Sequence, residues 1–239
     1  MLGYLCAYYR YYNPIEFITS FLNNAANDDD IQNGTILARQ RGIKIIQPKY
    51  GVSKGEYFFD KEKNVIAKGV SSVKYMSMAG ADELYELSQE KEYKFFIDLL
   101  RDISERTSID SRQLDILVKI DYFSQFGNQR ELFKIIEMFE MLKKGAAKKI
   151  RKDTVDGTWF GEIIKKHSIG VTKNGDEAKS YTIIDMEQTL HDVENYIKAS
   201  HVSDLSVFIK AKNFKDIMGY AGYVSGNEEI GRASCRERV

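Results

Sequence analysis

The sequence predicts a mostly α-helical fold with small β elements. The 239 residues include only two prolines, Pro14 and Pro48, and charged residues make up 29% of the chain, which favours long helices over a turn-rich β-sandwich. Apolar residues recur every three or four positions through most of the chain, which is the period of an amphipathic helix. Hydrophobic residues at 43% are enough for a packed core, so wholesale disorder is not expected.

The ends of the predicted helices carry the expected signals. Asn13-Pro14 separates the first two helices, because proline disfavours helical geometry in the residue before it and suits the first turn of a helix. The third helix begins with aspartates and ends near Gly42, which agrees with the helix dipole and with C-cap preferences. We predict helices at about 2–12, 14–22, 29–41, 79–88, 92–103, 111–120, 128–142, 186–199 and 203–217, and strands at 43–46, 57–59 and 65–67.

Composition excludes several function classes. The formal net charge is zero, which excludes a chain that coats DNA through bulk positive charge but allows a local basic patch. Cys6 and Cys235 lie far apart and form no disulfide framework, and the histidines match no zinc motif. No apolar run approaches the roughly 18 residues that a transmembrane helix needs, and the N-terminus lacks the features of a secretory signal. We therefore expect a soluble, cytoplasmic protein with no membrane partner.

Two segments differ from the rest in composition. Residues 143–152 contain many basic and no acidic residues, and we interpret 143–157 as a linker whose charge is either solvated or follows a phosphate backbone. Residues 231–239 resemble a recurrent translation artefact at the ends of assembled sequences, and a genuine basic tail is the alternative. Because the chain also enters directly into a helix, we expect it to be a fragment of a longer protein.

Motifs of one known family occur in the same order and at similar spacing at 3–17, 38–48, 57–59, 68–74 and 114–130. They resemble the C family of bacterial and phage replicative polymerases, the DNA polymerase III alpha subunit. Residues 3–17 resemble its tyrosine-rich helix, which ends in a Tyr-Pro-x-Glu-Phe turn. Residues 38–48 resemble its Arg-x-x-Gly-Ile-x-Val-x-Pro-Pro stretch, and 57–59 with 68–74 resemble its hairpin and the entry to a helix-hairpin-helix region. Residues 114–130 resemble its Leu-x-x-Leu-Ile-Lys-x-Gly-Ala-Phe-Asp-x-x-Gly-x-x-Arg segment. The resemblance covers about 3–145 and continues more weakly to about Gly226.

The resemblance implies a domain organisation. It places the end of the fingers domain at 1–46, a tandem helix-hairpin-helix DNA-binding region at 47–142, a basic linker and helical connector at 143–218, the start of a truncated oligonucleotide-binding (OB) module at 219–230, and the artefactual tail at 231–239.

The resemblance also implies a parent enzyme, a DNA-directed DNA polymerase and thus a nucleotidyltransferase of DNA replication. This fragment would lack the palm with its metal-binding aspartates, so no catalytic residue is expected in it. It would need no cofactor of its own, since the Mg²⁺ of the intact polymerase binds outside it. Three consecutive acids, Asp28-Asp29-Asp30, do not replace the palm, because they point in different directions at a helix start.

The function implied for the fragment is a sequence-independent grip on primer-template duplex DNA. Helix-hairpin-helix units hold phosphates through backbone amides of a tight hairpin and a helix N-terminus, usually with glycines that let the backbone approach. Here Lys74-Tyr75-Met76-Ser77 stands where the family often has Lys-x-Ile-Gly, so the first hairpin is expected to be mainly structural. Ile120-Asp121 replaces a small pair at the second hairpin, and Asp121 is expected to face away from phosphate or to cap a helix.

The candidate DNA-binding residues gather at these two hairpins. Phe123 and Phe126 are expected in the core rather than as stacking platforms. In the first helix one face is expected to be buried, with Arg10 towards the template. The candidates are Lys68, Ser71, Ser72 and Lys74 at the first hairpin, Arg112, Lys119, Gly127, Asn128, Gln129 and Arg130 at the second, and Arg10.

Two other function classes stay open: a stand-alone, non-enzymatic helix-hairpin-helix DNA-binding module, and a helical protein-interaction adaptor with no nucleic-acid role. Salt-dependent duplex binding separates the adaptor from the DNA binders. Other replisome subunits, such as the sliding clamp, are a further class of partner. Trp159-Phe160 lies where some family members carry a clamp-binding motif, but Asp156-Gly157 precede it and the expected Gln is absent.

Overall fold

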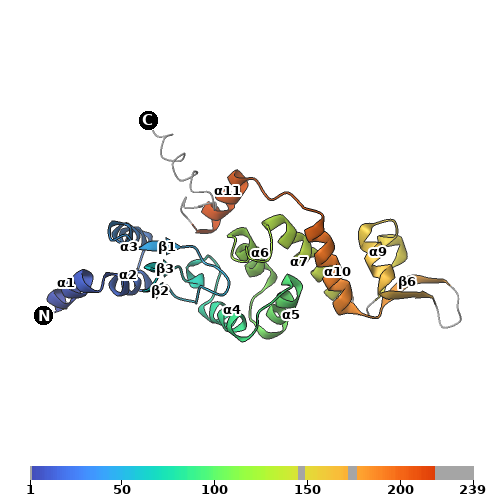
Figure 1. Cartoon of the computed structure of the whole chain (residues 1–239), viewed down its shortest axis with the longest axis horizontal. Helices are drawn as coiled ribbons and strands as arrows, with labels where there is room; N and C mark the ends of the chain where they lie inside the picture. Colours follow the sequence, from blue (N-terminus) through green and yellow to red (C-terminus); the bar gives the residue numbers. More distant parts are fainter. Residues whose placement is uncertain (1, 145–148, 172–176, 219–239) are drawn as a thin grey trace. The chain divides into compact units, whose positions relative to one another are not determined.

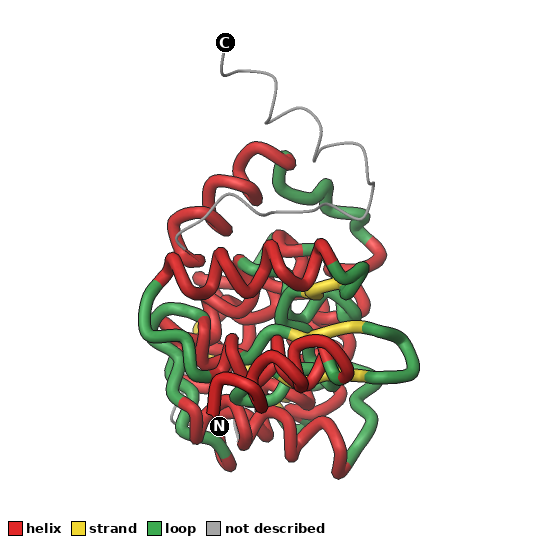
Figure 2. The backbone as a smooth tube through the Cα atoms, turned by 90° about the vertical axis from the view of Figure 1, so that its left-hand side faces the viewer, coloured by secondary structure: helices red, strands yellow, loops and turns green. Residues whose placement is uncertain are grey.

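The computed structural model describes residues 2–144, 149–171 and 177–218. Helices account for most of these residues and the sheets are small, which confirms the predicted fold class (Figures 1 and 2). The chain divides into two compact units. Unit 1 contains the described parts of 1–92, 106–123 and 206–239, and unit 2 contains those of 93–105 and 124–205. None of the helices within the described ranges is both long and apolar enough to cross a membrane.

Unit 1 combines helices with a three-stranded sheet. Its central strand β3 pairs in parallel with β1 and antiparallel with β2. Apolar side chains of α2 cover the sheet and form a core with Ile43 and Ile66. The elements are α1 (Leu2–Tyr12), α2 (Pro14–Asn23), α3 (Asp28–Gln40), β1 (Lys44–Ile46), β2 (Phe58–Asp60), β3 (Val65–Ala67), the 3₁₀ turn η1 (Val70–Ser72), α4 (Met78–Glu90), α6 (Ser111–Lys119) and α11 (Val207–Met218).

Side chains at helix ends fix these elements in place. Asn27 caps α3 by accepting a hydrogen bond from the Asp30 amide at 2.8 Å, so the aspartate run forms a helix start as expected. Asn23, at the end of α2, bonds both the amide and the carbonyl of Tyr57, at 2.7 and 3.0 Å. This pair of bonds joins α2 to the residue before β2.

The expectation of a buried face on α1 is wrong. Its tyrosines are all exposed, with Tyr4 at 74%, and Leu5 and Arg10 are exposed as well. Neighbouring rings pack on one another instead, as for Tyr8 and Tyr12, whose centroids are 4.7 Å apart. The apolar residues of α1 therefore recur with helical period but are exposed in the part of the chain that the structure describes.

Unit 2 places helices beside a second three-stranded sheet, in which β6 pairs antiparallel with both β4 and β5. Trp159 stacks on Tyr196 with ring centroids 4.4 Å apart, and Phe160 is buried. Both aromatic residues therefore pack against other parts of unit 2. The elements are α5 (Phe96–Arg106), α7 (Gln129–Lys144), β4 (Lys149–Arg151), α8 (Lys152–Val155), α9 (Trp159–Lys166), β5 (Ser168–Val171), β6 (Glu177–Ile183) and α10 (Met186–Ala199).

The structure corrects the linker predicted at 143–157. Within the described part of that range, Lys149–Arg151 forms strand β4 and Lys152–Val155 forms helix α8, whose Val155 is buried. Gly161 lies so close to this turn that a Cβ atom there would be 2.0 Å from the Val155 carbonyl oxygen. The predicted start of the OB module and the tail fall outside the described residues, and the domain boundaries stay predictions.

Candidate nucleic-acid interface

The first hairpin keeps a left-handed residue although it has no glycine. Tyr75 has a φ of 67°, a conformation that costs free energy for any residue with a Cβ. The Met76 amide donates to the Val73 carbonyl at 3.1 Å and closes the turn. Ser77 then caps α4, its hydroxyl accepting from the Gly80 amide at 3.1 Å. The tight turn is therefore formed by Val73-Lys74-Tyr75-Met76, and Ser77 starts the helix that follows.

Gln113, at the start of α6, holds this turn in place. Its Oε1 accepts from the Asp110 amide at 3.0 Å, and the Asp110 carboxylate accepts from the Gln113 amide at 2.7 Å, which makes a reciprocal cap. The Nε2 of Gln113 donates to the Tyr75 carbonyl at 2.8 Å. The strained residue is thus fixed by a side chain that the α6 cap has already oriented.

Two exposed cations flank the turn. The guanidinium carbon of Arg112 lies 4.0 Å from the centroid of the Tyr75 ring, which is itself 62% exposed. A guanidinium stacked on a ring uses its face, so its N–H groups can still donate at the edge. Lys74 donates one hydrogen bond, at 3.0 Å, to the Asp216 carbonyl in the last turn of α11. An ammonium group has three donors.

The start of α4 adds backbone donors beside these cations. The amides of Met78 and Ala79 belong to the first turn, where the helix itself supplies no acceptor. That turn contains no acidic residue, so the positive end of the helix dipole is not neutralised there. We call Lys74, Tyr75, Ser77 and Arg112, with this helix start, the hairpin surface. Its donors and charge suit a phosphate group.

At the start of α7, which follows the second hairpin, backbone amides donate to side chains of the same helix start. The Asn128 amide donates to the Glu131 carboxylate at 3.0 Å, and the Glu131 amide donates to Asn128 Oδ1 at 2.9 Å. The Nδ2 of Asn128 donates to the Val202 carbonyl at 2.8 Å. A carboxylate therefore lies at the helix start where a phosphate would otherwise bind.

The neighbours of Asn128 are engaged in the same way. Arg130 Nη1 lies 3.4 Å from both the carbonyl and the hydroxyl oxygen of Ser203, and Gln129 is fully buried. A Cβ at Gly127 would lie 2.8 Å from a Glu131 carboxylate oxygen. These predicted DNA-binding residues thus make contacts within unit 2.

The two acidic positions near the second hairpin pair with lysines of unit 1. Lys119 Nζ is 2.6 Å from the Asp115 carboxylate, one turn earlier in α6. Asp121 has a φ of 60° and its carboxylate lies 3.3 Å from Lys210 Nζ on α11. The positive φ explains why a small residue stands there in the resembling family, and the lysine neutralises the acid that replaces it.

Comparison with known proteins supports the polymerase interpretation. A family model for the helix-hairpin-helix motif matches residues 42–132. The DNA polymerase III subunit alpha of Buchnera aphidicola subsp. Schizaphis graminum is 26% identical over 233 residues, covering 90% of this chain and 19% of that protein. The corresponding subunit of Campylobacter jejuni is 26% identical over 167 residues, covering 68% of this chain and 14% of that protein.

The chain is similar to a segment of the DNA polymerase III alpha subunit. This confirms the resemblance that the sequence motifs indicate. The chain spans less than a fifth of the length of either alpha subunit. The helix-hairpin-helix match includes both hairpins, and at each of them a residue with a side chain, Tyr75 or Asp121, has a positive φ.

Three candidates before the first hairpin serve the fold. Lys68 is only 5% exposed, and its burial lowers the pKa of its amine to about 8. The Ser71 hydroxyl donates to the Gly55 carbonyl at 2.6 Å, and the Ser72 hydroxyl to the Gly69 carbonyl at 2.7 Å. Lys68 is therefore buried in the fold, and its role as a DNA contact stays a prediction.

Sequence reasoning missed Tyr75, Ser77 and Gln113 as site residues. The available signal was the departure of Lys74-Tyr75-Met76-Ser77 from the family's Lys-x-Ile-Gly, in which Ser77 replaces the glycine. Phe123 and Phe126 are buried, which confirms that they belong to the core.

Proposed function

We propose that the chain acts as a segment of a replicative DNA polymerase alpha subunit and that the hairpin surface holds the phosphate backbone of primer-template duplex DNA. The similarity to two alpha subunits and to the helix-hairpin-helix motif supports DNA as the partner. The observation that carries the proposal is the Arg112–Tyr75 stack beside a helix start with no acid in its first turn.

In this proposal the contacts are made to phosphate and not to bases. The Met78 and Ala79 amides donate to phosphate oxygens, while Arg112 and Lys74 add charge. Contacts of this type fix the position of a protein on the duplex and carry no sequence information. The segment would therefore grip any primer-template, and the synthesis reaction would belong to other parts of the parent polymerase.

The experiment is a fluorescence-anisotropy titration of a labelled primer-template duplex with the 239-residue chain, repeated on duplexes of unrelated sequence and over a range of salt concentrations. Each phosphate neutralised by a cation contributes roughly −0.9 to the slope of log K against log salt. We expect Arg112→Ala and Lys74→Ala to weaken binding to all duplexes alike and to make the slope less steep.

The matched controls are exposed cations away from the hairpin surface, Arg39 on α3 for Arg112 and Lys134 on α7 for Lys74. Their alanine variants are expected to leave binding nearly unchanged. Binding that does not depend on salt, or a loss confined to one duplex sequence, would contradict the proposal. The first result would favour the protein-interaction adaptor instead.

A further inference from the structure

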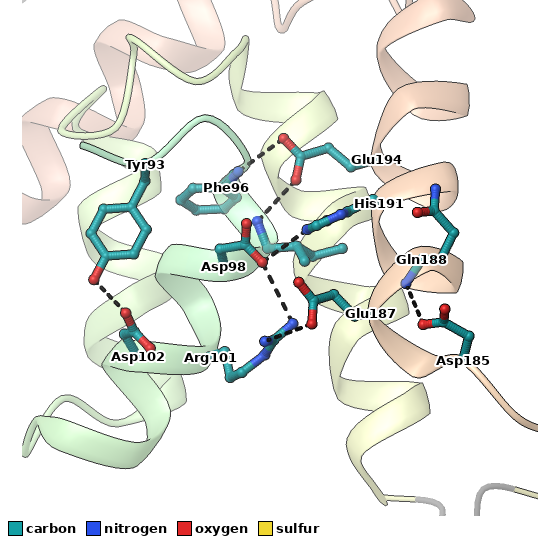
Figure 3. Close-up of polar contacts among 11 residues, drawn as sticks. Tyr93, Phe96, Asp98, Arg101, Asp102, Asp185, Glu187, Gln188, His191 and Glu194 are labelled. Atoms are coloured by element: carbon teal, nitrogen blue, oxygen red, sulfur yellow. Dashed lines mark hydrogen bonds and ion pairs between the residues drawn. The ribbon is translucent and has the colours of Figure 1, made fainter. Parts of the chain in front are cut away.

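A second polar cluster lies in unit 2, where α10 faces α5 (Figure 3). Glu187 and His191 are four residues apart in α10 and so lie on the same face of that helix. Asp98 of α5 points towards them, and its Oδ1 is 2.9 Å from His191 Nε2. One possible ligand atom from each of the three residues lies within 4.8 Å of those of the other two.

The surrounding residues hold these side chains in position. The His191 imidazole stacks on the Phe95 ring, with centroids 4.1 Å apart and an interplanar angle of 15°. Glu194, one turn further along α10, is fully buried, and its two carboxylate oxygens each accept a backbone N–H at 2.9 Å, from Phe96 and Ile97. This contact fixes the first turn of α5, and therefore Asp98, against α10.

The cluster is open to solvent on one side. The side chains of Asp98 and His191 are 20% and 16% exposed, whereas that of Glu187 is 65% exposed, which leaves an entry path for an ion. Arg101 pairs with both carboxylates, and its contacts are long: 3.5 Å to Asp98 and 3.9 Å to Glu187. One guanidinium facing two carboxylates leaves excess negative charge beside the imidazole.

We propose that Asp98, Glu187 and His191 bind a divalent transition-metal ion of the Zn²⁺ class. Two carboxylates and one imidazole are ligands that Zn²⁺ accepts, with water in a fourth position, whereas Mg²⁺ and Ca²⁺ prefer oxygen ligands throughout. The metal takes the Nε2 position that now bonds Asp98, so the imidazole binds as the neutral tautomer protonated on Nδ1. Arg101 swings towards solvent as the ion draws the two carboxylates together.

The bound ion would link α5 to α10 inside unit 2. It is independent of the phosphate contacts proposed for unit 1, because its ligands come from α5 and α10 alone. The expected consequence is a higher thermal midpoint of the chain in the presence of the ion, since an ion that binds the folded chain in preference to the unfolded one stabilises it.

The test uses the 239-residue chain without a histidine tag, because a tag would itself bind metal. Co²⁺ serves as the spectroscopic probe, and Zn²⁺ affinity follows from displacement of Co²⁺ and from calorimetry. We expect one equivalent to bind.

Two variants test the ligands: Glu187→Gln at the exposed ligand, and His191→Gln, which keeps a donor for Asp98. Each should weaken metal binding at least about tenfold, because the loss of a residue that only supports a ligand already costs 10–100-fold in metal affinity. Glu137→Gln, at an exposed acid on α7, is the matched control and should bind as the wild type does.

Arg101→Gln separates a metal site from a plain network of ion pairs. If the guanidinium competes with the ion, this variant binds Zn²⁺ more tightly than the wild type. The proposal is overturned if the wild type binds no ion, if the Glu187 and His191 variants bind it as well as the wild type, or if Arg101→Gln leaves the affinity unchanged or lowers it. Duplex binding measured in the presence of a chelator shows separately whether the hairpin surface binds DNA.

Discussion

The two hairpins carry similar sequence features but differ in what their donors contact. At the first, Arg112 is stacked on an exposed ring and the start of α4 has no acid in its first turn. At the start of α7, Asn128 donates to the Val202 carbonyl, Arg130 approaches Ser203, and Glu131 accepts a hydrogen bond at the helix start. The side-chain donors at the start of α7 are thus used within the fold, whereas at the first hairpin Arg112 is held by a ring face and Lys74 uses one of its three donors.

The largest expected effect concerns Lys68, which lies next to the first hairpin in the sequence but inside the fold. The pKa of its amine is about 8 in the folded chain and 10.5 in the unfolded one, because burial disfavours the charged form. Lys68→Met should therefore raise the free energy of unfolding at pH 7 by up to about 3 kcal/mol, at 1.36 kcal/mol per pKa unit.

The pH dependence of this effect has a definite sign. Between pH 8 and 10.5 the unfolded chain holds the proton that the folded chain has lost, so the wild type gains stability as pH rises. The advantage of Lys68→Met should shrink over that window, as measured by urea unfolding at pH 7 and pH 10. The variant should bind duplex DNA like the wild type, and a clear loss of binding would show that Lys68 reaches DNA after all.

Arg112→Ala should weaken duplex binding about tenfold, or about 1.4 kcal/mol, because it removes a charge-assisted contact with phosphate. Anisotropy titration at constant salt checks this. Arg112→Lys distinguishes charge from shape, since lysine keeps the charge but loses the planar edge above Tyr75. Affinity of Arg112→Ala equal to that of the wild type would remove the main difference between the two hairpins.

Gln113→Glu tests the bond that holds the left-handed turn. The new carboxylate still accepts from the Asp110 amide but cannot donate to the Tyr75 carbonyl. We expect a loss of about 1 kcal/mol in the free energy of unfolding at neutral pH, the usual value of one hydrogen bond. Urea unfolding measures it. Unchanged stability of this variant would mean that the turn holds its shape without Gln113.

Arg130→Ala should have the smallest effect, changing duplex affinity by less than about twofold. Its guanidinium is 3.4 Å from two oxygens of Ser203, and the residue is exposed, so its removal also costs little stability. The same anisotropy titration applies. A loss of duplex affinity as large as that of Arg112→Ala would mean that both hairpins contact phosphate, and the two would then not differ as proposed.

Local pattern predicted most helices and the first sheet, because Pro14, the aspartates before α3 and the apolar periods act within a few residues. The same reasoning missed β4, because Lys149-Ile150-Arg151 is only three residues long and lies inside the basic run that was interpreted as a linker. It could not find Glu194 under the start of α5 or Val202 beside Asn128, because such contacts join residues about 70 to 100 positions apart. The left-handed Tyr75 was hidden too, as a tyrosine gives no sign of a positive φ.

The most direct test of the central claim compares the salt dependence of duplex binding for the wild type, Arg112→Ala and Arg130→Ala. If the hairpin surface alone holds phosphate, Arg112→Ala makes the slope of log K against log salt less steep by roughly 0.9, while Arg130→Ala leaves it unchanged. Equal slopes for all three proteins, or a reduced slope for Arg130→Ala alone, would contradict the account.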